Sequence, residues 1–262
     1  MWDKKTVSVV LPTLNEKDSI RNHIDALFET GVVDEVVVIN NNAVQGTSFE
    51  VAKTRAREVK EPRQGYGYSV RRGLEEAIGD LVILSEPDGS FVARDIFKLL
   101  AFEADFDVVL GSRTIQGFIW RGANMGFFLR TGNWSVAKLI QVLFNTTSLS
   151  DVGCTMRLIS RWALDTILPS CTVGGSHFSV EFILNSLLSG FRLVQIPVNY
   201  LPRVGISSAT GRTSIAIAIG LRMIGFILAR RVRTFWLHPP RRRLQPDLAF
   251  DFGNKPIHER NV

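Results

Sequence analysis

The 262-residue sequence predicts an α/β fold in which a three-layer, mostly parallel sheet of the Rossmann-like kind has helices on both faces. Short apolar runs alternate with helical patterns through residues 1–115, which is typical of βαβ units. In addition, 45% of the residues are hydrophobic and 21% are charged, which suits a chain of this length with a buried core. An apolar and basic C-terminal helix is expected to follow the sheet.

The predicted elements of the first part alternate as a parallel sheet requires. Strands are predicted at Val7–Leu14, Glu35–Asn40, Glu58–Lys60, Asp80–Leu84 and Asp107–Gly111. Helices are predicted at Ser19–Thr30, Ser48–Arg57, Tyr68–Ile78 and Ala93–Glu103. The first helix has Asp18 or Ser19 to cap it. Its apolar stripe, which suits packing on a sheet, consists of Ile20, Ile24, Leu27 and Phe28.

Beyond Arg113 the pattern is less regular. Residues 114–134 mix aromatic side chains with arginines and glycines, which fits either a core helix or a segment in the interfacial layer of a membrane. Two more helices are predicted at Trp162–Leu168 and Ser179–Leu188, and a strand follows at Arg192–Tyr200.

A last helix is predicted at Ile215–Ala229. It would be about 23 Å long, shorter than the roughly 30 Å hydrocarbon core of a bilayer, and Arg222 lies near its middle. We therefore expect it to lie in a membrane interface, anchored by Trp236 and the nearby arginines, or against a second subunit of a homo-oligomer. The expected division is a main domain at 1–213, this helical segment at 214–237 and a flexible tail at 238–262.

Positive charge is concentrated near the C-terminus. Residues 182–246 contain ten arginines and no Asp or Glu, although the net charge of the chain is only +6. This segment should face phosphate groups or an anionic membrane surface. Nucleic acid is not expected as a partner, because the arginines occur without a recognisable reading motif. The first strand begins close to Met1 without a signal-peptide pattern, so a cytoplasmic location is expected.

Polar, turn-forming residues follow four of the predicted strands. They are residues 12–16, 40–42, 86–88 and 111–113. Each group is common at a strand end for structural reasons alone. However, the carboxyl ends of parallel strands meet at one edge of a sheet, where ligands bind in such folds. We therefore expect these groups to form one site.

Seven stretches resemble inverting nucleotide-sugar glycosyltransferases with the A-type fold in their order and spacing. They read SVVLPTLNE, VINNNA, RQGYGYSVRRGLEEAIGD, SEPDGSF, VVLGSR, DVGCTMRLISRWAL and VNYLPRVGIS. The similarity covers about residues 5–215 and is greatest to dolichol-phosphate mannose synthases and polyprenyl-phosphate glycosyltransferases, with Arg203–Ser207 as its most specific part. It implies a catalytic domain at 1–213 that transfers a hexose from a UDP-glucose- or GDP-mannose-class donor to a dolichyl- or undecaprenyl-type phosphate. The reaction would take place at the cytosolic face of a membrane, with the protein bound peripherally.

The resemblance also implies roles for individual residues. Asp88, Arg113 and Arg203 would be catalytic, and Mg²⁺ or Mn²⁺ would neutralise the leaving group. The metal would be held at the family's DxD position by Glu86, Asp88 and Ser90. The donor would contact Pro12, Leu14, Glu16, Asn40, Asn41, Arg63, Gly65 and Pro87. The acceptor phosphate would contact Arg203, Ser207 and Arg212.

The sequence departs from the family pattern at three places. Glu86 stands where the family has aspartate, which moves the carboxylate by about one C–C bond. Asn40 and Asn41 stand where paired aspartates usually contact the nucleoside, so uridine and guanosine donors both stay open. Ser208 stands where lysine is common, and Arg212 could supply the missing cation.

The acceptor can be a sugar hydroxyl or a lipid phosphate. A hydroxyl would need a general base, for which Asp151 and Glu181 are candidates. A phosphate is already ionised and needs arginines to hold it, so the acid-free segment favours the phosphate. Two alternatives stay open: a transferase acting on sugar hydroxyls in polysaccharide or glycan synthesis, and a catalytically impaired nucleotide-sugar-binding protein.

Overall fold

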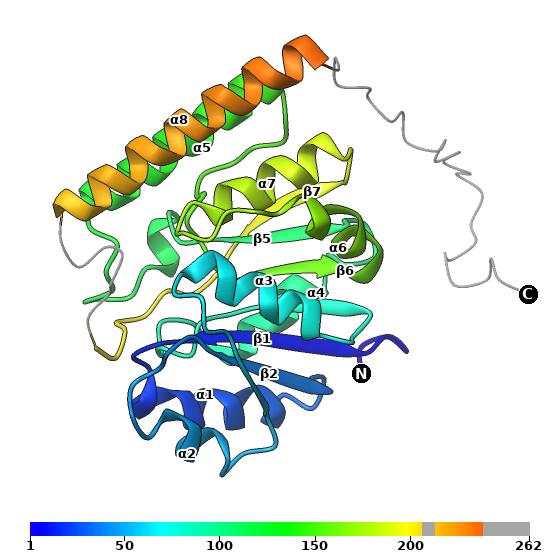
Figure 1. Ribbon diagram of the computed structural model, residues 1–262, viewed down its shortest axis with the longest axis vertical. Coiled ribbons are helices and arrows are strands. Elements are labelled where there is room, and N and C mark those ends of the chain that lie inside the picture. The colour runs from blue at the N-terminus through cyan, green and yellow to red at the C-terminus, as the bar shows by residue number, and fades with distance from the viewer. Residues whose placement is uncertain (206–212, 238–262) are drawn as a thin grey trace, which may run out of the picture.

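The structure is a computed structural model that describes residues 1–205 and 213–237. Within these residues, seven strands form one sheet in the order β3-β2-β1-β4-β6-β5-β7 (Figure 1). The strands are β1 (Val7–Thr13), β2 (Glu35–Asn40), β3 (Arg57–Lys60), β4 (Leu81–Leu84), β5 (Val108–Ser112), β6 (Arg157–Ser160) and β7 (Leu193–Pro197). The α/β fold class predicted from the sequence is confirmed.

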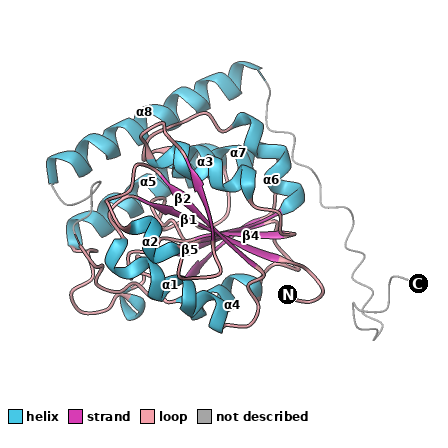
Figure 2. Cartoon of the chain, turned by 60° about the horizontal axis from the view of Figure 1, so that its bottom comes forward, coloured by secondary structure: helices cyan, strands magenta, loops and turns pink. Residues whose placement is uncertain are grey.

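Helices cover both faces of the sheet, as Figure 2 shows. They are α1 (Lys17–Glu29), α2 (Thr47–Val51), α3 (Tyr66–Glu76), α4 (Ile96–Leu100), α5 (Phe127–Phe144), α6 (Arg161–Ile167), α7 (Phe178–Leu188) and α8 (Thr213–Leu237). Short 3₁₀ turns occupy Ala93–Asp95, Gln116–Phe118 and Leu168–Ser170. The second predicted helix was too long, because the chain turns after Val51 and β3 already begins at Arg57.

The central strands are buried on both faces, as parallel strands beneath two helical layers must be. β1 pairs in parallel with β2 and with β4, and Thr13 lies opposite Asn40 at the carboxyl end of the pair. The strand ends that carry polar residues therefore meet at one edge, as the sequence predicted.

β6 was not predicted. It lies between β4 and β5 and runs antiparallel to both, with Leu84 opposite Arg157. Ser160 ends this strand and begins α6, because its hydroxyl accepts a hydrogen bond from the backbone N–H of Ala163. The strand predicted last also ends earlier than expected, at Pro197, and continues as an irregular segment toward Tyr200.

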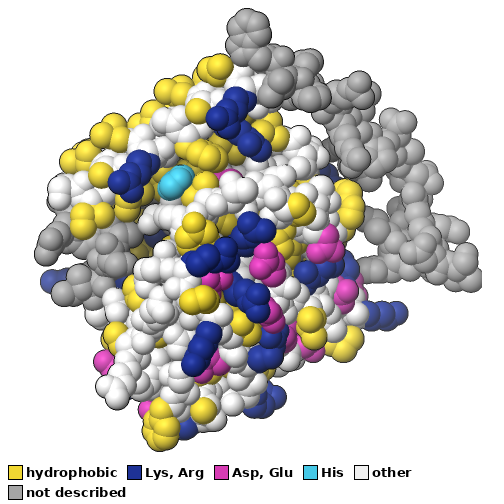
Figure 3. Space-filling view, viewed as in Figure 1, with side chains coloured by type: hydrophobic (Ala, Val, Ile, Leu, Met, Phe, Trp, Pro, Cys, Tyr) yellow, Lys and Arg dark blue, Asp and Glu magenta, His cyan; other side chains and the backbone are white. Residues whose placement is uncertain are grey.

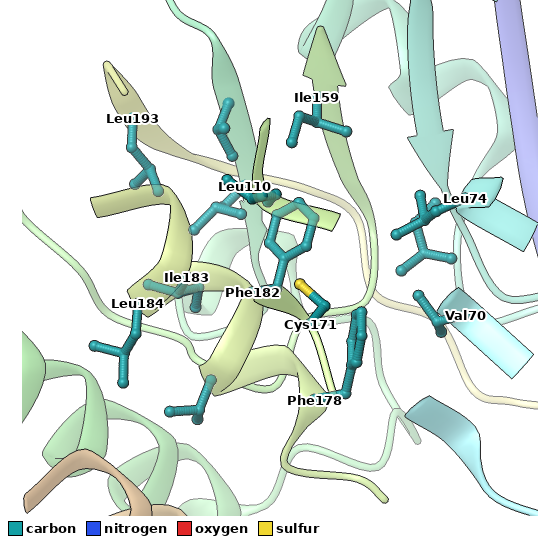
Figure 4. Close-up of a cluster of buried hydrophobic side chains, with 14 of the residues drawn as sticks. Val70, Leu74, Leu110, Ile159, Cys171, Phe178, Phe182, Ile183, Leu184 and Leu193 are labelled. Carbon is teal, nitrogen blue, oxygen red and sulfur yellow. The ribbon is translucent and has the colours of Figure 1, made fainter. Parts of the chain in front are cut away.

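Two hydrophobic cores lie on opposite faces of the sheet. Ile20, Ile24 and Leu27 of α1 and the apolar residues of α4 pack on one face. On the other face, α3, α6 and α7 cover the sheet, and Figure 4 shows Phe178 and Phe182 of α7 packed toward its strands. The two cores fix the strand ends from both sides.

α5 and α8 lie side by side outside the layer formed by α3 and α7 (Figure 1). They run in the same direction, since Arg231 of α8 lies over the Phe144 ring at the end of α5, 5.8 Å from its centroid. Met223 and Ile227 are the buried side of α8. Among the described helices, none is both long and apolar enough to cross a membrane.

Candidate active site

A cavity of about 650 Å³ opens at the carboxyl ends of the central strands. Its polar part is formed by the loops that follow β1, β4 and β5 and by the start of α3. Its apolar part is formed by α5 and α8. These helices contribute Phe128, Leu129, Val136, Ala216, Ile217, Ile219, Leu221, Met223 and Ile224, among others.

Glu16 organises the loop after β1. Its Oε2 accepts hydrogen bonds from the backbone N–H of Leu14 at 2.6 Å and of Asn15 at 2.8 Å. The Thr13 hydroxyl donates to the same oxygen at 3.1 Å. Oε1 remains directed toward Arg203 Nη2, 3.6 Å away. The side chain that was predicted to contact the donor therefore also shapes the loop that lines the cavity.

Arg203 joins the loop after β1 to the loop after β4. Its Nη2 lies 3.2 Å from Asp88 Oδ2, and the backbone N–H of Val204 donates to the Asp88 carbonyl at 2.8 Å. The Nε of Arg203 is buried and has no hydrogen-bond partner. The guanidinium thus has a free donor beside two carboxylates, which is a suitable arrangement for an incoming phosphate group.

Glu86, Asp88 and Ser90 offer oxygen atoms for a metal ion. Asp88 is 2% exposed, and its Oδ1 accepts from the backbone N–H of Ser90. Burial, and then the neighbouring Asp88 carboxylate, raise the pKa of Glu86 to about 8. The buried Ser90 hydroxyl has no partner. Such hard oxygen ligands fit Mg²⁺ or Mn²⁺.

Protein side chains alone do not complete a metal site here. Among the described residues, no group of three or more His, Cys, Asp or Glu side chains could hold a metal ion. Mg²⁺ characteristically binds through one or two carboxylates and completes its shell with water and substrate phosphates. The pair of Glu86 and Asp88 matches that mode of binding.

Asn41 connects the end of β2 to the loop before α3. Its Nδ2 donates to the carbonyls of Glu61 and Arg63, both at 2.8 Å, and its Oδ1 accepts from the backbone N–H of Gly65 at 3.0 Å. An aspartate could not donate these bonds. Asn40 lies outside the cavity lining, and its amide donates to Glu58 Oε1 at 2.7 Å.

The start of α3 is fixed by close backbone contact with the loop before α7. Gly67 donates its N–H to the Gly174 carbonyl at 2.9 Å, and a Cβ at Gly67 would lie 2.0 Å from the Val173 carbonyl oxygen. Gly65 has φ +151° and is equally crowded, with the Gly174 oxygen 2.4 Å from a hypothetical Cβ. Both positions therefore require glycine.

Arg113 and Asp151 form a buried bidentate pair. Arg113 Nε donates to Asp151 Oδ2 at 2.9 Å and Nη2 donates to Oδ1 at 3.1 Å. Burial opposes the charge on Asp151, but Arg113 holds the pKa of this carboxyl below its usual range. The guanidinium lies over the Tyr200 ring, 5.2 Å from its centroid. Asp151 thus holds Arg113 at the cavity wall.

The chain matches the model of "Glycosyl transferase family 2" over residues 8–168. It is 30% identical over 207 residues to the low-salt glycan biosynthesis hexosyltransferase Agl6 of Haloferax volcanii, covering 76% of this chain and 49% of that protein. It is also 30% identical over 201 residues to an uncharacterized glycosyltransferase of Mycobacterium tuberculosis, covering 76% of this chain and 87% of that protein. The chain belongs to glycosyl transferase family 2.

Solved structures with the same fold include glucosyl-3-phosphoglycerate synthase of Mycobacterium tuberculosis in complex with Mn²⁺, uridine diphosphate and phosphoglyceric acid. The TM-score is 0.65 at 18% identity, covering 87% of this chain and 79% of that chain. A complex of the same enzyme with Mg²⁺ and uridine diphosphate has a TM-score of 0.66 at 19% identity, covering 87% and 80%. At this identity the likeness establishes the glycosyltransferase fold.

Most residues predicted for the site of this glycosyltransferase line one cavity. They are Pro12, Leu14, Glu16, Asn41, Gly65, Glu86, Pro87, Arg113 and Arg203. Asp88 and Ser90 lie directly behind this lining through the contacts described above. Arg63 is not part of the lining and pairs with Glu61 instead, Nε to Oε1 at 2.9 Å. Ser207 and Arg212 fall outside the described residues.

The apolar half of the cavity was not predicted from the sequence. α5 and α8 are far apart in the chain, and each was predicted only as a membrane or subunit contact or as a core helix. Their exposed aromatic and aliphatic residues were the available signal, but periodicity cannot show that two such helices enclose a cavity together.

Proposed function

We propose that this family 2 glycosyltransferase transfers a hexose, with inversion, from a nucleotide sugar to a polyprenyl phosphate at the cytosolic face of a membrane. One observation carries the proposal: the cavity joins a polar end, with carboxylates and arginines, to an apolar wall built by α5 and α8. A lipid phosphate has the same division into a charged head and an apolar chain.

The polar end would hold the nucleotide diphosphate. Glu86, Asp88 and Ser90 would bind Mg²⁺ or Mn²⁺, which would place positive charge against the diphosphate leaving group. Arg203 has the free Nε described above for a phosphate oxygen. The solved relatives that bind Mn²⁺ or Mg²⁺ with uridine diphosphate support this assignment.

The hydrogen bonding of the candidate bases favours a phosphate acceptor. Asp151 is engaged by Arg113, and both oxygens of Glu181 accept from the backbone N–H of Thr172, at 2.9 and 3.0 Å. Neither carboxylate is free to remove a proton from a sugar hydroxyl. An ionised phosphate needs no base. Its oxygen would attack the anomeric carbon as the bond to the diphosphate breaks and the nucleoside diphosphate leaves with the electron pair.

The outer surface of α5 and α8 would contact the membrane. Large hydrophobic side chains are exposed there, including Phe127, Trp134, Val142, Leu228 and Val232. Figure 3 shows hydrophobic side chains interspersed with Lys and Arg along this side of the molecule. Such a mixture suits the interface of a bilayer with anionic headgroups. Contact with a second copy of the chain is the alternative for this surface.

In this proposal residues 1–213 are the catalytic domain and 214–237 the membrane-contacting segment. The predicted tail at 238–262 lies outside the described residues. The chain spans about half the length of Agl6, so a shared hexosyltransferase activity is part of the proposal.

The proposal is tested by incubating the protein with labelled UDP-glucose or GDP-mannose, a polyprenyl phosphate and Mg²⁺ or Mn²⁺. Label should appear in the extracted lipid. Asp88→Asn should lower this transfer by about 100-fold or more, because it weakens binding of the metal ion whose positive charge would stabilise the leaving group. Asp105→Asn, a change at an exposed surface carboxylate, is the matched control and should transfer normally.

Other outcomes would replace the proposal. Label on phosphoglycerate or on a free glycan, with none in lipid, would indicate a hydroxyl acceptor. Binding of a nucleotide sugar without any turnover would indicate the catalytically impaired alternative.

A further inference from the structure

The floor of the cavity contains hydroxyl groups without a hydrogen-bond partner. Ser69 and Thr155 line the cavity, are 1% and 6% exposed, and have buried hydroxyl oxygens that nothing contacts by a hydrogen bond. The Tyr66 hydroxyl oxygen is also buried without a hydrogen-bond partner. Buried polar groups in native proteins are nearly always paired, and each exception needs an explanation.

These three groups come from two elements that meet at the polar end of the cavity. Tyr66 and Ser69 are three residues apart on α3 and therefore lie on the same side of that helix. Thr155 lies two residues before Arg157, which is paired with Leu84 across β4 and β6. Thr155 and Glu86 of the candidate metal site, which follows β4, both line the cavity.

A buried cation lies behind the hydroxyl groups. Arg157 is 2% exposed, donates to the Cys154 carbonyl and lies 5.0 Å from the centroid of the Phe182 ring. Its Nε and Nη1 have no partner, and no carboxylate of the described residues forms an ion pair with it. The Tyr66 hydroxyl can also donate a hydrogen bond. The floor therefore offers donors to electron-rich oxygens.

The floor is also rigid. The first turn of α3 is held by the Gly67–Gly174 contact, and Arg157 holds the backbone beside Thr155 through the Cys154 carbonyl. Hydroxyl groups held in this way are suited to select a ligand by hydrogen bonds, because their geometry is set before the ligand arrives.

We propose that Tyr66, Ser69 and Thr155 form the subsite that binds the hydroxyl groups of the hexose being transferred. The inference rests on the proposed function in one respect: the donor is a nucleotide sugar. A site built to hydrogen-bond a substrate hydroxyl strongly rejects the analogue that lacks it, so these three residues determine which hexose is accepted. In this proposal the nucleoside diphosphate binds at Glu86, Asp88 and Arg203 and makes no hydrogen bond to these three residues.

The test compares binding of UDP-glucose, GDP-mannose and the two free nucleoside diphosphates to the full chain with Mg²⁺ by calorimetry. Ser69→Ala, Thr155→Val and Tyr66→Phe should each lower the affinity for the nucleotide sugar by about tenfold, as expected for one lost hydrogen bond to a ligand. Affinity for the corresponding nucleoside diphosphate should change by less than about twofold. A nucleotide sugar that lacks one sugar hydroxyl should bind the variant without the matching protein hydroxyl as tightly as it binds the unaltered protein.

Stability provides a second readout that a merely structural role would not give. Because the hydroxyls of Ser69 and Thr155 are buried without a partner, Ser69→Ala and Thr155→Val should leave the melting temperature unchanged or raise it. Ser186→Ala is the matched control: its buried hydroxyl donates to the Phe182 carbonyl at 2.8 Å, outside the cavity. This control should lower the melting temperature and leave nucleotide-sugar affinity unchanged.

The outcomes separate this inference from the proposed function. The subsite is overturned if the variants bind nucleotide sugar as tightly as the unaltered protein does, or if their affinity for the nucleoside diphosphate drops as much as that for the nucleotide sugar. If only the affinity for nucleotide sugar drops and no label reaches lipid, the subsite is supported and the proposed acceptor is wrong.

Discussion

Asn41 makes hydrogen bonds that an aspartate in the same position could not make. Its amide donates to two backbone carbonyls and accepts from the N–H of Gly65, so it fixes the loop that leads to α3. In Asn41→Asp the buried carboxylate would face those carbonyl oxygens without a donor between them. We expect a loss of about 2 kcal/mol in the free energy of unfolding, measured by urea denaturation.

Asn42→Asp is the control for this change. Asn42 is exposed, so water can replace the hydrogen bonds that its Nδ2 donates to the Pro62 carbonyl and to Gln64 Oε1. Its φ of +58° is a conformation that both Asn and Asp tolerate. Its replacement should cost less than about 0.5 kcal/mol. Equal losses for the two variants would contradict the role given to Asn41.

His23 makes the stability of the fold depend on pH. It is 7% exposed on α1, and its Nε2 lies 3.4 Å from the Ser85 hydroxyl. Burial lowers its pKa from 6.5 to about 4, and the Asp88 carboxylate opposes this shift only in part. Between these values the unfolded chain takes up a proton that the folded protein does not, so the contribution of neutral His23 is lost as pH falls below 6.5.

The test compares the protein with His23→Gln at pH 7.5 and pH 5. The difference in unfolding free energy between the two should shift by about 2 kcal/mol in favour of the variant at the lower pH. Comparing the two proteins cancels the titration of the carboxylates that they share. A difference that does not change with pH would show that His23 is not buried in its neutral form.

The positions of individual site residues could be predicted from the sequence, but the directions of their side chains could not. Asn40 ends β2 and Asn41 follows it, but successive side chains point to opposite sides of an extended chain. Asn41 therefore reaches the cavity, whereas Asn40 bonds Ser48 and Glu58. The sequence does not indicate that the hydroxyls of Ser69 and Thr155 lack partners, because nothing in it distinguishes them from other serines and threonines.

At the scale of elements, the parallel strands were predictable and the antiparallel one was not. β1, β2 and β4 are continuous apolar runs, which two-sided burial requires. β6 has only two apolar residues between Arg157 and Ser160 and leads directly into α6, so it lacks the continuous apolar pattern of a buried strand. Arg157 can be buried there because its guanidinium reaches the Cys154 carbonyl and the Phe182 ring.

The pair formed by α5 and α8 illustrates a second limit. The periodicity of each helix indicates an apolar face, but not what covers it. In the structure one side of α8 packs inward through Met223 and Ile227, and residues near its start line the cavity. Its remaining apolar residues, such as Leu228, stay exposed. One helix can therefore serve the cavity on one side and an external surface on another.

The whole molecule has two chemically different ends. The lower part in Figure 1, around β1 and β2, has surface arginines that are paired with carboxylates, as in Arg57 with Glu35 and Glu76. The end formed by α5 and α8 has exposed hydrophobic residues. α5 contains no acidic residue, and α8 lies in the acid-free segment 182–246. An anionic membrane surface would therefore attract one end of the molecule and orient the cavity toward the lipid.

This orientation gives a final prediction about the intact protein. It should bind vesicles containing phosphatidylglycerol more tightly than vesicles of phosphatidylcholine alone, and raising the salt from about 0.05 M to about 0.5 M should reduce that preference. Leu228→Glu, which puts a negative charge on the exposed side of α8, should weaken binding at both salt concentrations. Ile78→Glu changes a hydrophobic residue that is 80% exposed after α3, and it should bind like the unaltered protein. If Leu228→Glu instead converts a dimer to a monomer in sedimentation experiments and leaves vesicle binding unchanged, the α5–α8 surface is a subunit contact, and the acceptor must reach the cavity from solution.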